Sequence, residues 1–434
     1  MLRFCRILEN LDLVKKMEFG SRSLEKDSTA ERHHVSIEIM NEDNLASSIK
    51  DKMELISVSH SVCRVPEELL KGNEEKYFPS SVSIGPFHHG KAVLRVMEDQ
   101  KWRYLHALIS RKPNPEATLE SCVTALRRTE HKARNFYSER INMGSDQFVE
   151  MMLLDGCFII ELFLVYAIKS LRRRDDPCFS TNNMLFQLKC DLILLENQVP
   201  FFILEQLFHL VPIPKHCHMS LIELALFFFK KLIDHSQFPP EIFRLETHHF
   251  LDLIRQHYLP TYPQVPSSGR QTHIDPATHL QSARIRVEKA ISEIPSNINF
   301  YHGKLKIPSL ELHGYTEILF RNLIAMELNV PKCSKHVASY AILMEQLLRT
   351  KEDVRLLRSR DILIDVHERR EEEIVLLFKS LHVNINVKEF YYGGSVKKLR
   401  CIKQERGIFM TELTWELLDS VWQRCFWFFF SQQL

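Results

Sequence analysis

Glycine is scarce in this chain, with 12 residues among 434, which argues against folds that need glycine at many tight turns. A dinucleotide-binding fold and a β-propeller are folds of that kind. An excess of one charge sign is also missing, because 57 basic residues face 55 acidic ones and the formal net charge is +2. Since the whole molecule has no field that would attract nucleic acid, we expect no nucleic-acid partner.

The cysteines lack the spacing of a zinc site or a disulfide framework. The chain has 10 of them and no C-x-x-C pair. Several lie in apolar runs, where cysteine acts as a small core residue, so we expect reduced thiols. The first residues, "MLRFCRILENLDLVKKMEFG", lack the uninterrupted apolar stretch of a signal peptide, and we expect that the protein is not secreted.

A run of apolar residues that could span a membrane without interruption is absent. The stretch Phe148 to Ile168 has about the right length, but Glu150, Asp155 and Glu161 interrupt it. Each acid at mid-bilayer would cost roughly 2.5–3.5 kcal/mol on insertion scales. We therefore interpret this stretch as a helix buried inside the protein.

Complete catalytic motifs are missing as well, including the serine motif G-x-S-x-G. The stretch "GPFHHGKA", Gly85 to Ala92, fits seven of the eight positions of the phosphate-binding pattern G-x-x-x-x-G-K-[ST]. However, Ala92 has no hydroxyl for magnesium, and Pro86 has no N–H for a phosphate. We interpret the stretch as a structural turn.

Histidines offer a possible metal site, with His88 and His89 as one half and His216, Cys217 and His218 as the other. Adjacent histidines point apart, and H-x-H places both rings on one side only in an extended segment. We therefore interpret these residues as surface or capping histidines. The sequence assigns no catalytic, cofactor-binding or metal residue, and no cofactor is expected.

Polar residues inside apolar runs are the remaining candidates. Glu196-Asn197-Gln198 either forms a catalytic cluster or satisfies backbone groups at a helix break, and the second interpretation is favoured. Asp155 and Glu161 are expected to pair with buried basic residues such as Arg134.

Apolar residues at helical spacing are what the chain has in abundance, and they predict a mainly α fold, a large helical domain with a few short strands or hairpins. One amphipathic helix is predicted after the glycine loop, in "VLRVMEDQKWRYLHALISR". Further helices are predicted at about 119–140, 147–171, 186–197, 200–210, 219–234, 277–293, 314–329, 335–350 and 368–381. Strands are predicted at 81–84, 303–312 and 384–394.

Three parts are predicted along the chain: a flexible leader at 1–49, the helical domain at 50–395, and a divergent tail at 396–434. The stretch 259–276, rich in proline and serine, is a mobile loop within one domain or a joint between two lobes. The aromatic end of the tail packs on the domain, enters a membrane interface, or is the scar of a shortened chain. The residues for such membrane contact are Trp422, Trp427, Phe428, Phe429 and Phe430.

Several stretches together resemble one plant family, the domain of unknown function 247. In order they are "VPEELL", "YFPSSVSIGPFHHG", "MEDQKWRYL", "FVEMMLLDGCFIIELF", "LILLENQVPFFILEQLF", "FLDLIR", "GKLKIPSLEL", "LFRNLIAMEL" and "DVRLL". The similarity covers about residues 55–395. It implies a plant protein of unknown biochemical activity, because no catalytic activity is established for the family.

The resemblance also implies a role. Family members in grasses are implicated in self-incompatibility, which suggests recognition or signalling between proteins. Similar members end in an apolar membrane anchor, which implies the cytoplasmic side of the plasma membrane, or the cytoplasm if the anchor is lost. This chain departs from them after "NVKEFYYGGSVKKL". We expect a non-catalytic protein with protein partners of unknown identity, and the alternative is a soluble hydrolase or transferase with a pocket in the helical domain.

Overall fold

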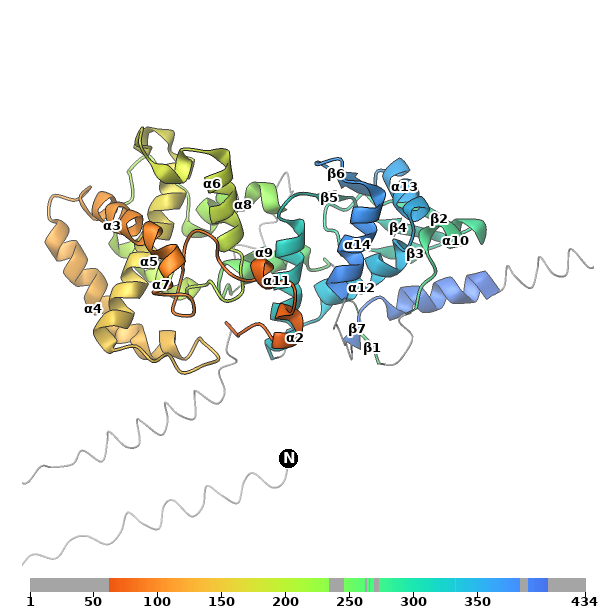
Figure 1. The fold of residues 1–434 in the computed structure, drawn as a ribbon, viewed down its shortest axis with the longest axis horizontal. Helices are drawn as coiled ribbons and strands as arrows, with labels where there is room; N and C mark the ends of the chain where they lie inside the picture. Colours follow the sequence, from red (N-terminus) through yellow and green to blue (C-terminus); the bar gives the residue numbers. More distant parts are fainter. Residues whose placement is uncertain are drawn as a thin grey trace, which may run out of the picture. The chain divides into compact units, whose positions relative to one another are not determined.

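The computed structural model describes residues 62–233, 246–261, 264, 266–268, 273–331, 333–382 and 389–404. These residues form a mainly helical structure with a few short strands, which confirms the predicted fold class (Figure 1). The predicted leader and the aromatic residues Trp422, Trp427, Phe428, Phe429 and Phe430 lie outside the described residues. The proposed boundaries of leader, domain and tail therefore stay predictions.

The helices of the described residues overlap the predicted ranges except at Glu67–Leu70, Phe250–Tyr258 and Lys351–Ser359, where no helix was predicted. They are α2 (Glu67–Leu70), α3 (Arg95–Ile109), α4 (Pro115–Arg134), α5 (Ser145–Ala167), α6 (Asn182–Asp191), α7 (Phe201–Leu210), α8 (Leu221–Ile233), α9 (Phe250–Tyr258), α10 (Ala277–Ser282), α11 (Thr316–Asn329), α12 (His336–Leu347), α13 (Lys351–Ser359) and α14 (Glu371–His382). Residues 393–404 are also helical.

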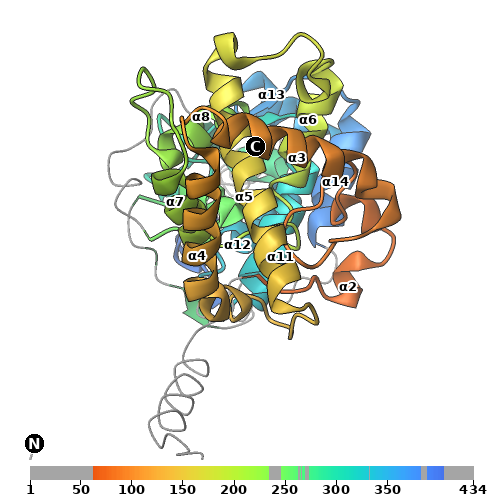
Figure 2. The same cartoon turned by 90° about the vertical axis from the view of Figure 1, so that its left-hand side faces the viewer.

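Helix α5 is the centre of the first group of helices. Helices α3, α4, α7 and α8 pack against it, so nearly every residue of α5 from Phe148 to Val165 is buried (Figure 2). A helix that is covered on all sides is apolar on all sides. This surrounding explains the long apolar stretch and confirms its interpretation as a buried helix. Among the described helices, no segment has the length and apolar character needed to cross a membrane.

Short strands pair in three small sheets, all in the second half of the described chain. They are β1 (Ser267–Ser268), β2 (Arg286–Lys289), β3 (Asn299–Tyr301), β4 (Lys304–Ile307), β5 (Leu310–Leu312), β6 (Leu363–Asp365) and β7 (Glu389–Phe390). One sheet has the order β2-β4-β3, with β2 parallel and β3 antiparallel to β4. Strands β5 and β6 are parallel, whereas β1 and β7 are antiparallel. Helices α11, α12 and α14 pack on one another beside these sheets.

Several predicted elements were wrong in extent or type. The helix predicted at 277–293 ends at Ser282, and β2 follows it. The strand predicted at 303–312 is two strands, because Pro308 lies between β4 and β5 and cannot donate to a ladder. Helix α13 was not predicted as a separate helix, although Thr350 and Asp353 form a capping box at its start.

Two further differences surround the glycine loop. The helix predicted at 186–197 ends at Asp191, and turns follow it. The stretch 81–84 is not a strand, because its backbone bonds to side chains rather than to a neighbouring strand.

Candidate functional site

The segment from Ser80 to Gly85 runs from the surface into the interior, where residues 82–85 are buried, and polar side chains hold its backbone. The carboxylate of Asp191, at the end of α6, accepts hydrogen bonds from the backbone N–H groups of Ser80, Ser81 and Val82 at 2.9, 2.7 and 2.9 Å. Asp191 is almost completely buried. Burial raises the pKa of this carboxyl to about 6, and the three N–H groups oppose that rise.

The side chain of Asn197 also binds the backbone of this segment, at Val82 and Ile84. Its Oδ1 accepts the Ile84 N–H at 2.7 Å, and its Nδ2 donates to the carbonyls of Val82 and Asp191 at 3.1 and 2.9 Å. All of these groups are buried, so each one needs a partner inside the protein. The amide of Asn197 therefore replaces the neighbouring strand that this extended segment lacks.

Gln198 likewise binds backbone groups at the break between α6 and α7. Its Nε2 donates to the carbonyls of Leu192 and Leu194, both at 2.8 Å, and its Oε1 accepts the Phe250 N–H at 3.1 Å. Asn197 and Gln198 thus satisfy backbone groups at a helix break, which is the interpretation that the sequence favoured.

A buried ion pair completes the inner face of the segment. Lys101 of α3 and Asp155 of α5 approach at 2.6 Å between Nζ and Oδ1. The Lys101 ammonium also donates to the Ser83 carbonyl at 2.6 Å and to Glu98 at 2.7 Å, and Asp155 Oδ2 accepts the Gly85 N–H at 2.8 Å. Burial disfavours the charge on Lys101, but the two carboxylates outweigh it and raise the pKa of Lys101.

Asp155 and Glu161 both pair with basic residues, as expected from the sequence, but the named partner Arg134 was wrong. Arg134 pairs with Glu130 on its own helix at 2.8 Å. Asp155 pairs with Lys101 instead, and Glu161 pairs with Arg111 at 2.5 Å. Both true partners lie on or just after α3, a helix that the sequence pattern places but does not orient.

The turn after this segment has a backbone that favours glycine. Gly85 and Gly90 have φ of 74° and 77°, in the left-handed region. A Cβ on Gly85 would clash with the Gln198 carbonyl oxygen, whereas a Cβ on Gly90 would meet nothing within 4 Å. The Gly85 N–H donates to the Asp155 carboxylate in the interior, so it is not available to a phosphate.

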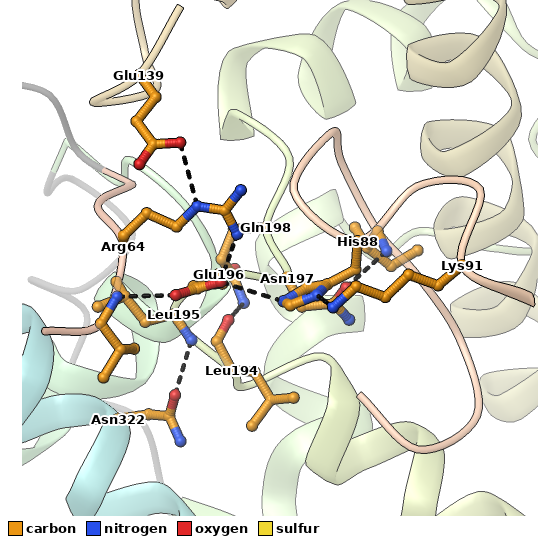
Figure 3. Close-up of polar contacts among 12 residues, drawn as sticks. Arg64, His88, Lys91, Glu139, Leu194, Leu195, Glu196, Asn197, Gln198 and Asn322 are labelled. Carbon is orange, nitrogen blue, oxygen red and sulfur yellow. Dashed lines mark hydrogen bonds and ion pairs between the residues drawn. The ribbon is translucent and has the colours of Figure 1, made fainter. Parts of the chain in front are cut away.

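His88, in the middle of the turn, is fully buried between two opposite charges (Figure 3). Lys91 Nζ lies 2.8 Å from Nδ1 of His88. Because an ammonium can only donate, Nδ1 is the acceptor and the neutral ring carries its proton on Nε2. That Nε2 lies 3.4 Å from Glu196 Oε2. Burial, together with the charges of Lys91 and Arg64, lowers the pKa of His88 to about 3.

Glu196 ties this turn to the start of the described chain. Its Oε1 accepts the Val65 N–H at 2.8 Å, and its Oε2 lies 2.8 Å from Nη1 of Arg64. Arg64 also reaches Glu139 at 3.2 Å, and its guanidinium lies over the Phe87 ring at 4.0 Å from the centroid. A row of alternating charged and polar groups thus runs from Glu139 at the surface to Lys91 (Figure 3).

The histidines proposed as halves of a metal site have different environments. His88 is buried and His89 is exposed, while His216 and His218 are exposed and Cys217 is half-buried. Within the described ranges, no group of three histidine, cysteine, aspartate or glutamate side chains has an arrangement that could hold a metal ion.

Three residues of the site were missed by the sequence reasoning, namely Arg64, Lys101 and Asp191. The signal for Asp191 was present, because this acid stands directly before the apolar stretch "LILL", as Glu196 stands directly after it. Lys101 gave no such signal, since a lysine on an amphipathic helix is usually exposed.

The comparisons with known proteins place the chain in a family. The family described as plant protein of unknown function, domain of unknown function 247, matches residues 62–430. The chain belongs to this family. The match includes the whole site, from Arg64 through the turn to Gln198, and it confirms the resemblance inferred from the sequence.

Relatives of this domain of unknown function 247 protein are found in Arabidopsis thaliana. A UPF0481 protein of that plant is 31% identical over 370 residues, which is 79% of this chain and 77% of the relative. A second UPF0481 protein is 26% identical over 166 residues, or 38% of this chain and 30% of the relative. No solved structure matches the chain.

Proposed function

We propose that this plant protein is a non-catalytic interaction protein, and that the surface formed by residues 89–96 contacts a protein partner. The observation that carries the proposal is the use made of the buried polar groups. Asp191, Asn197, Gln198 and the pair Lys101 and Asp155 all bind the backbone of the chain itself. Such bonds fix the shape of the turn that lies before this surface.

The outer face of the segment 89–96 offers apolar surface to a partner. Val93 and Val96 are 80% and 83% exposed, next to the exposed residues Lys91 and Ala92. A single exposed apolar side chain needs no explanation, but neighbouring exposed apolar side chains can mark a contact site for another protein. Because Leu94, between these valines, and Met97, directly after them, are buried, this short segment is anchored while its outer side is free to make contact.

The pKa of His88 supports a structural role for this residue. A histidine with a pKa of about 3 stays neutral near pH 7 and is poorly matched to proton transfer there. Each of the three buried acids is held by a different basic residue, since Asp155 binds Lys101, Glu161 binds Arg111 and Glu196 binds Arg64. An open hollow of about 510 Å³ lies beside residues 138–143, and none of these three acids lines it.

A role in recognition or signalling on the cytoplasmic side of a plant membrane is the finer part of this proposal. Its support is the family resemblance in the sequence, and membrane contact through the aromatic tail stays a prediction because those residues lie outside the described ranges. This part is tested by fractionating plant cells that express the full chain.

The interaction proposal is tested with two matched double variants. Val93→Asp with Val96→Asp places two charges on the proposed surface, while Ile291→Asp with Val366→Asp places two charges on exposed apolar residues elsewhere. Partners that co-purify with the full chain from plant cells are identified and then titrated as purified proteins. We expect the first variant to bind at least one partner roughly tenfold or more weakly than the parent chain, and the second variant to bind it with unchanged affinity.

Equal binding by both variants to every partner would contradict the proposal. It would also be contradicted if the purified chain turned over a substrate and mutation of His88 or Glu196 lowered the rate. Both variants change exposed residues, so both should unfold at nearly the temperature of the parent protein.

A further inference from the structure

A group of positive charges follows α5 and is used by nothing described so far. Lys169, Arg172, Arg173 and Arg174 are all exposed and lie within six residues. None of the four forms an ion pair with another residue that the structure describes. Other surface cations behave differently, for example Arg127, which pairs with Asp146, and Lys304, which pairs with Glu288.

Local structure accounts for the position of some of these side chains but not for their number. Lys169 follows the C-terminus of α5, where carbonyl groups favour a cation. The Arg172 guanidinium lies over the Phe179 ring at 4.2 Å from the centroid. Burial raises the pKa of Glu161, and the charge of Arg173, together with that of Arg111, opposes the rise.

Acidic neighbours do not cancel this charge. Asp175 is exposed beside Arg174 and offsets one positive charge. Asp176 is buried and accepts hydrogen bonds from the Tyr104 hydroxyl and from the Cys178 backbone N–H. The segment from Lys169 to Asp175 therefore carries a clear positive excess.

Helix α8 adds an aromatic ring beside the end of α5 and, one turn further along α8, an exposed cation. Phe227 of α8 packs against Tyr166, near the end of α5, with ring centroids 5.5 Å apart, and it is 41% exposed. Lys230, three residues later on the same helix, is also exposed. The loop that joins α5 to α6 lies at the top of the view in Figure 2. We call these six residues the basic surface: Lys169, Arg172, Arg173, Arg174, Phe227 and Lys230.

We propose that the basic surface docks this protein on an anionic lipid bilayer. Each lysine or arginine near such a bilayer contributes attraction, and an aromatic ring at its edge is favourable at the level of the headgroups. The hollows that the structure shows around residues 131–143, 68–77 and 309–320 are lined by other residues. The four cations after α5 are all exposed, and such an open arrangement suits a bilayer better than it suits a free phosphate. This inference goes beyond the protein contact proposed above and uses a different surface.

The test is sedimentation of the purified full chain with vesicles. Neutral phosphatidylcholine vesicles are compared with vesicles that also contain phosphatidylserine, at low and at physiological salt. The variant Lys169→Gln with Arg174→Gln removes two charges and spares Arg172 on Phe179 and Arg173 near Glu161. The control Lys397→Gln with Lys398→Gln removes two exposed charges elsewhere.

We expect the parent chain to bind the anionic vesicles more tightly than the neutral ones, and the binding to weaken as salt screens the charges. The first variant should bind the anionic vesicles roughly tenfold to thirtyfold more weakly, since each cation near the bilayer contributes roughly threefold to fivefold in affinity. The control and the charge-preserving variant Lys169→Arg with Arg174→Lys should bind like the parent chain.

Three results would overturn the proposal. The first is equal binding to neutral and anionic vesicles, and the second is equal loss in the first variant and the control. The third is displacement from vesicles by inorganic phosphate or by duplex RNA at a charge concentration equal to that of the lipid, which would indicate a soluble anion or a nucleic acid as the ligand. Vesicle binding uses no protein partner, so its failure leaves the contact at residues 89–96 untouched.

Discussion

The backbone N–H and carbonyl groups of extended segments find their hydrogen-bond partners in two different ways in two regions of this protein. At Ser80 to Gly85 the partners are side chains: Asp191 of α6, Asn197 after it, and the pair Lys101 and Asp155. In the sheet formed by β2, β4 and β3, the partners are the N–H and carbonyl groups of neighbouring strands. Both solutions meet the same requirement, that buried backbone groups be hydrogen-bonded.

The difference lies in what each region demands from the sequence. A ladder between strands uses groups that every residue except proline has, so the sheet tolerates exchange of exposed side chains. The segment at 80–85 depends on particular carboxylates, one amide and one ammonium at fixed places, all in the interior. Substitutions there should be far more costly than substitutions of exposed residues in the sheet.

The largest effect should come from breaking the buried ion pair. Lys101→Met keeps the length of the side chain but leaves Asp155 buried without its counter-charge and the Ser83 carbonyl without its donor. We expect a loss of roughly 3–5 kcal/mol in the free energy of unfolding, measured by urea denaturation. The matched control, Arg127→Gln in the exposed pair with Asp146, should cost less than about 1 kcal/mol. Similar losses in the two variants would mean that the pair does not hold the segment.

A smaller loss is expected when the acceptor for three N–H groups is changed. Asp191→Asn leaves one acceptor oxygen where the carboxylate has two, and its new NH₂ group faces backbone donors. The expected cost is roughly 2–4 kcal/mol, because buried donors lose their partners. Lys306→Thr on the exposed side of β4 provides the comparison from the sheet and should stay within about 0.5 kcal/mol. If urea denaturation shows that the two substitutions lower the free energy of unfolding equally, the segment at 80–85 does not depend on particular side chains more than the sheet does.

The sequence predicts the helical class and most helices of this protein because burial follows a regular spacing in them. Helix α5 is an example, since its apolar residues on all sides indicate that neighbours surround it. The end of α10 was missed because the apolar residues Ile285 and Val287 also suit a helix, and only the pairing of β2 with β4 decides for a strand.

The same reasoning predicts only part of the site. Asn197 and Gln198 stand out as amides between apolar runs, so their role at a helix break could be inferred from the chain itself. The pairing of Asp155 with Lys101 could not, because it depends on how α3 packs against α5. His88 is a similar case, since a histidine in a glycine turn usually lies at the surface and nothing local predicts that Glu196 lies against it.

Two glycines of the turn separate backbone strain from close packing. Gly85 and Gly90 have nearly the same positive φ, but only a Cβ on Gly85 would clash, with the Gln198 carbonyl oxygen. We expect Gly90→Ala to cost about 1 kcal/mol from the backbone alone and Gly85→Ala to cost roughly 2–3 kcal/mol. Thermal unfolding of the two variants measures the difference. Equal costs would show that the segment can move away from Gln198, and thus that the side chains hold it less firmly than we infer.

A smaller effect than the loss of the buried ion pair is a dependence of stability on pH that comes from His88. Its pKa in the folded protein is about 3 and its ordinary value is near 6.5, so the folded state favours the neutral ring. This contribution is fully present above pH 6.5 and is lost as the pH falls toward 3, because the unfolded chain takes up the proton first. Between pH 7 and pH 5 the loss should be about 2 kcal/mol.

The variant His88→Asn isolates the contribution of His88 to the free energy of unfolding. The charges that face His88 are Lys91, Arg64 and Glu196, and they remain in the variant, as does Asp191 with its raised pKa. Their titration therefore cancels when the free energies of unfolding of the two proteins are subtracted at each pH. The stability advantage of the parent protein should shrink as the pH falls from 7 to 5. A constant difference would mean that His88 can be protonated in the folded protein, which would return this residue to the list of groups able to transfer a proton.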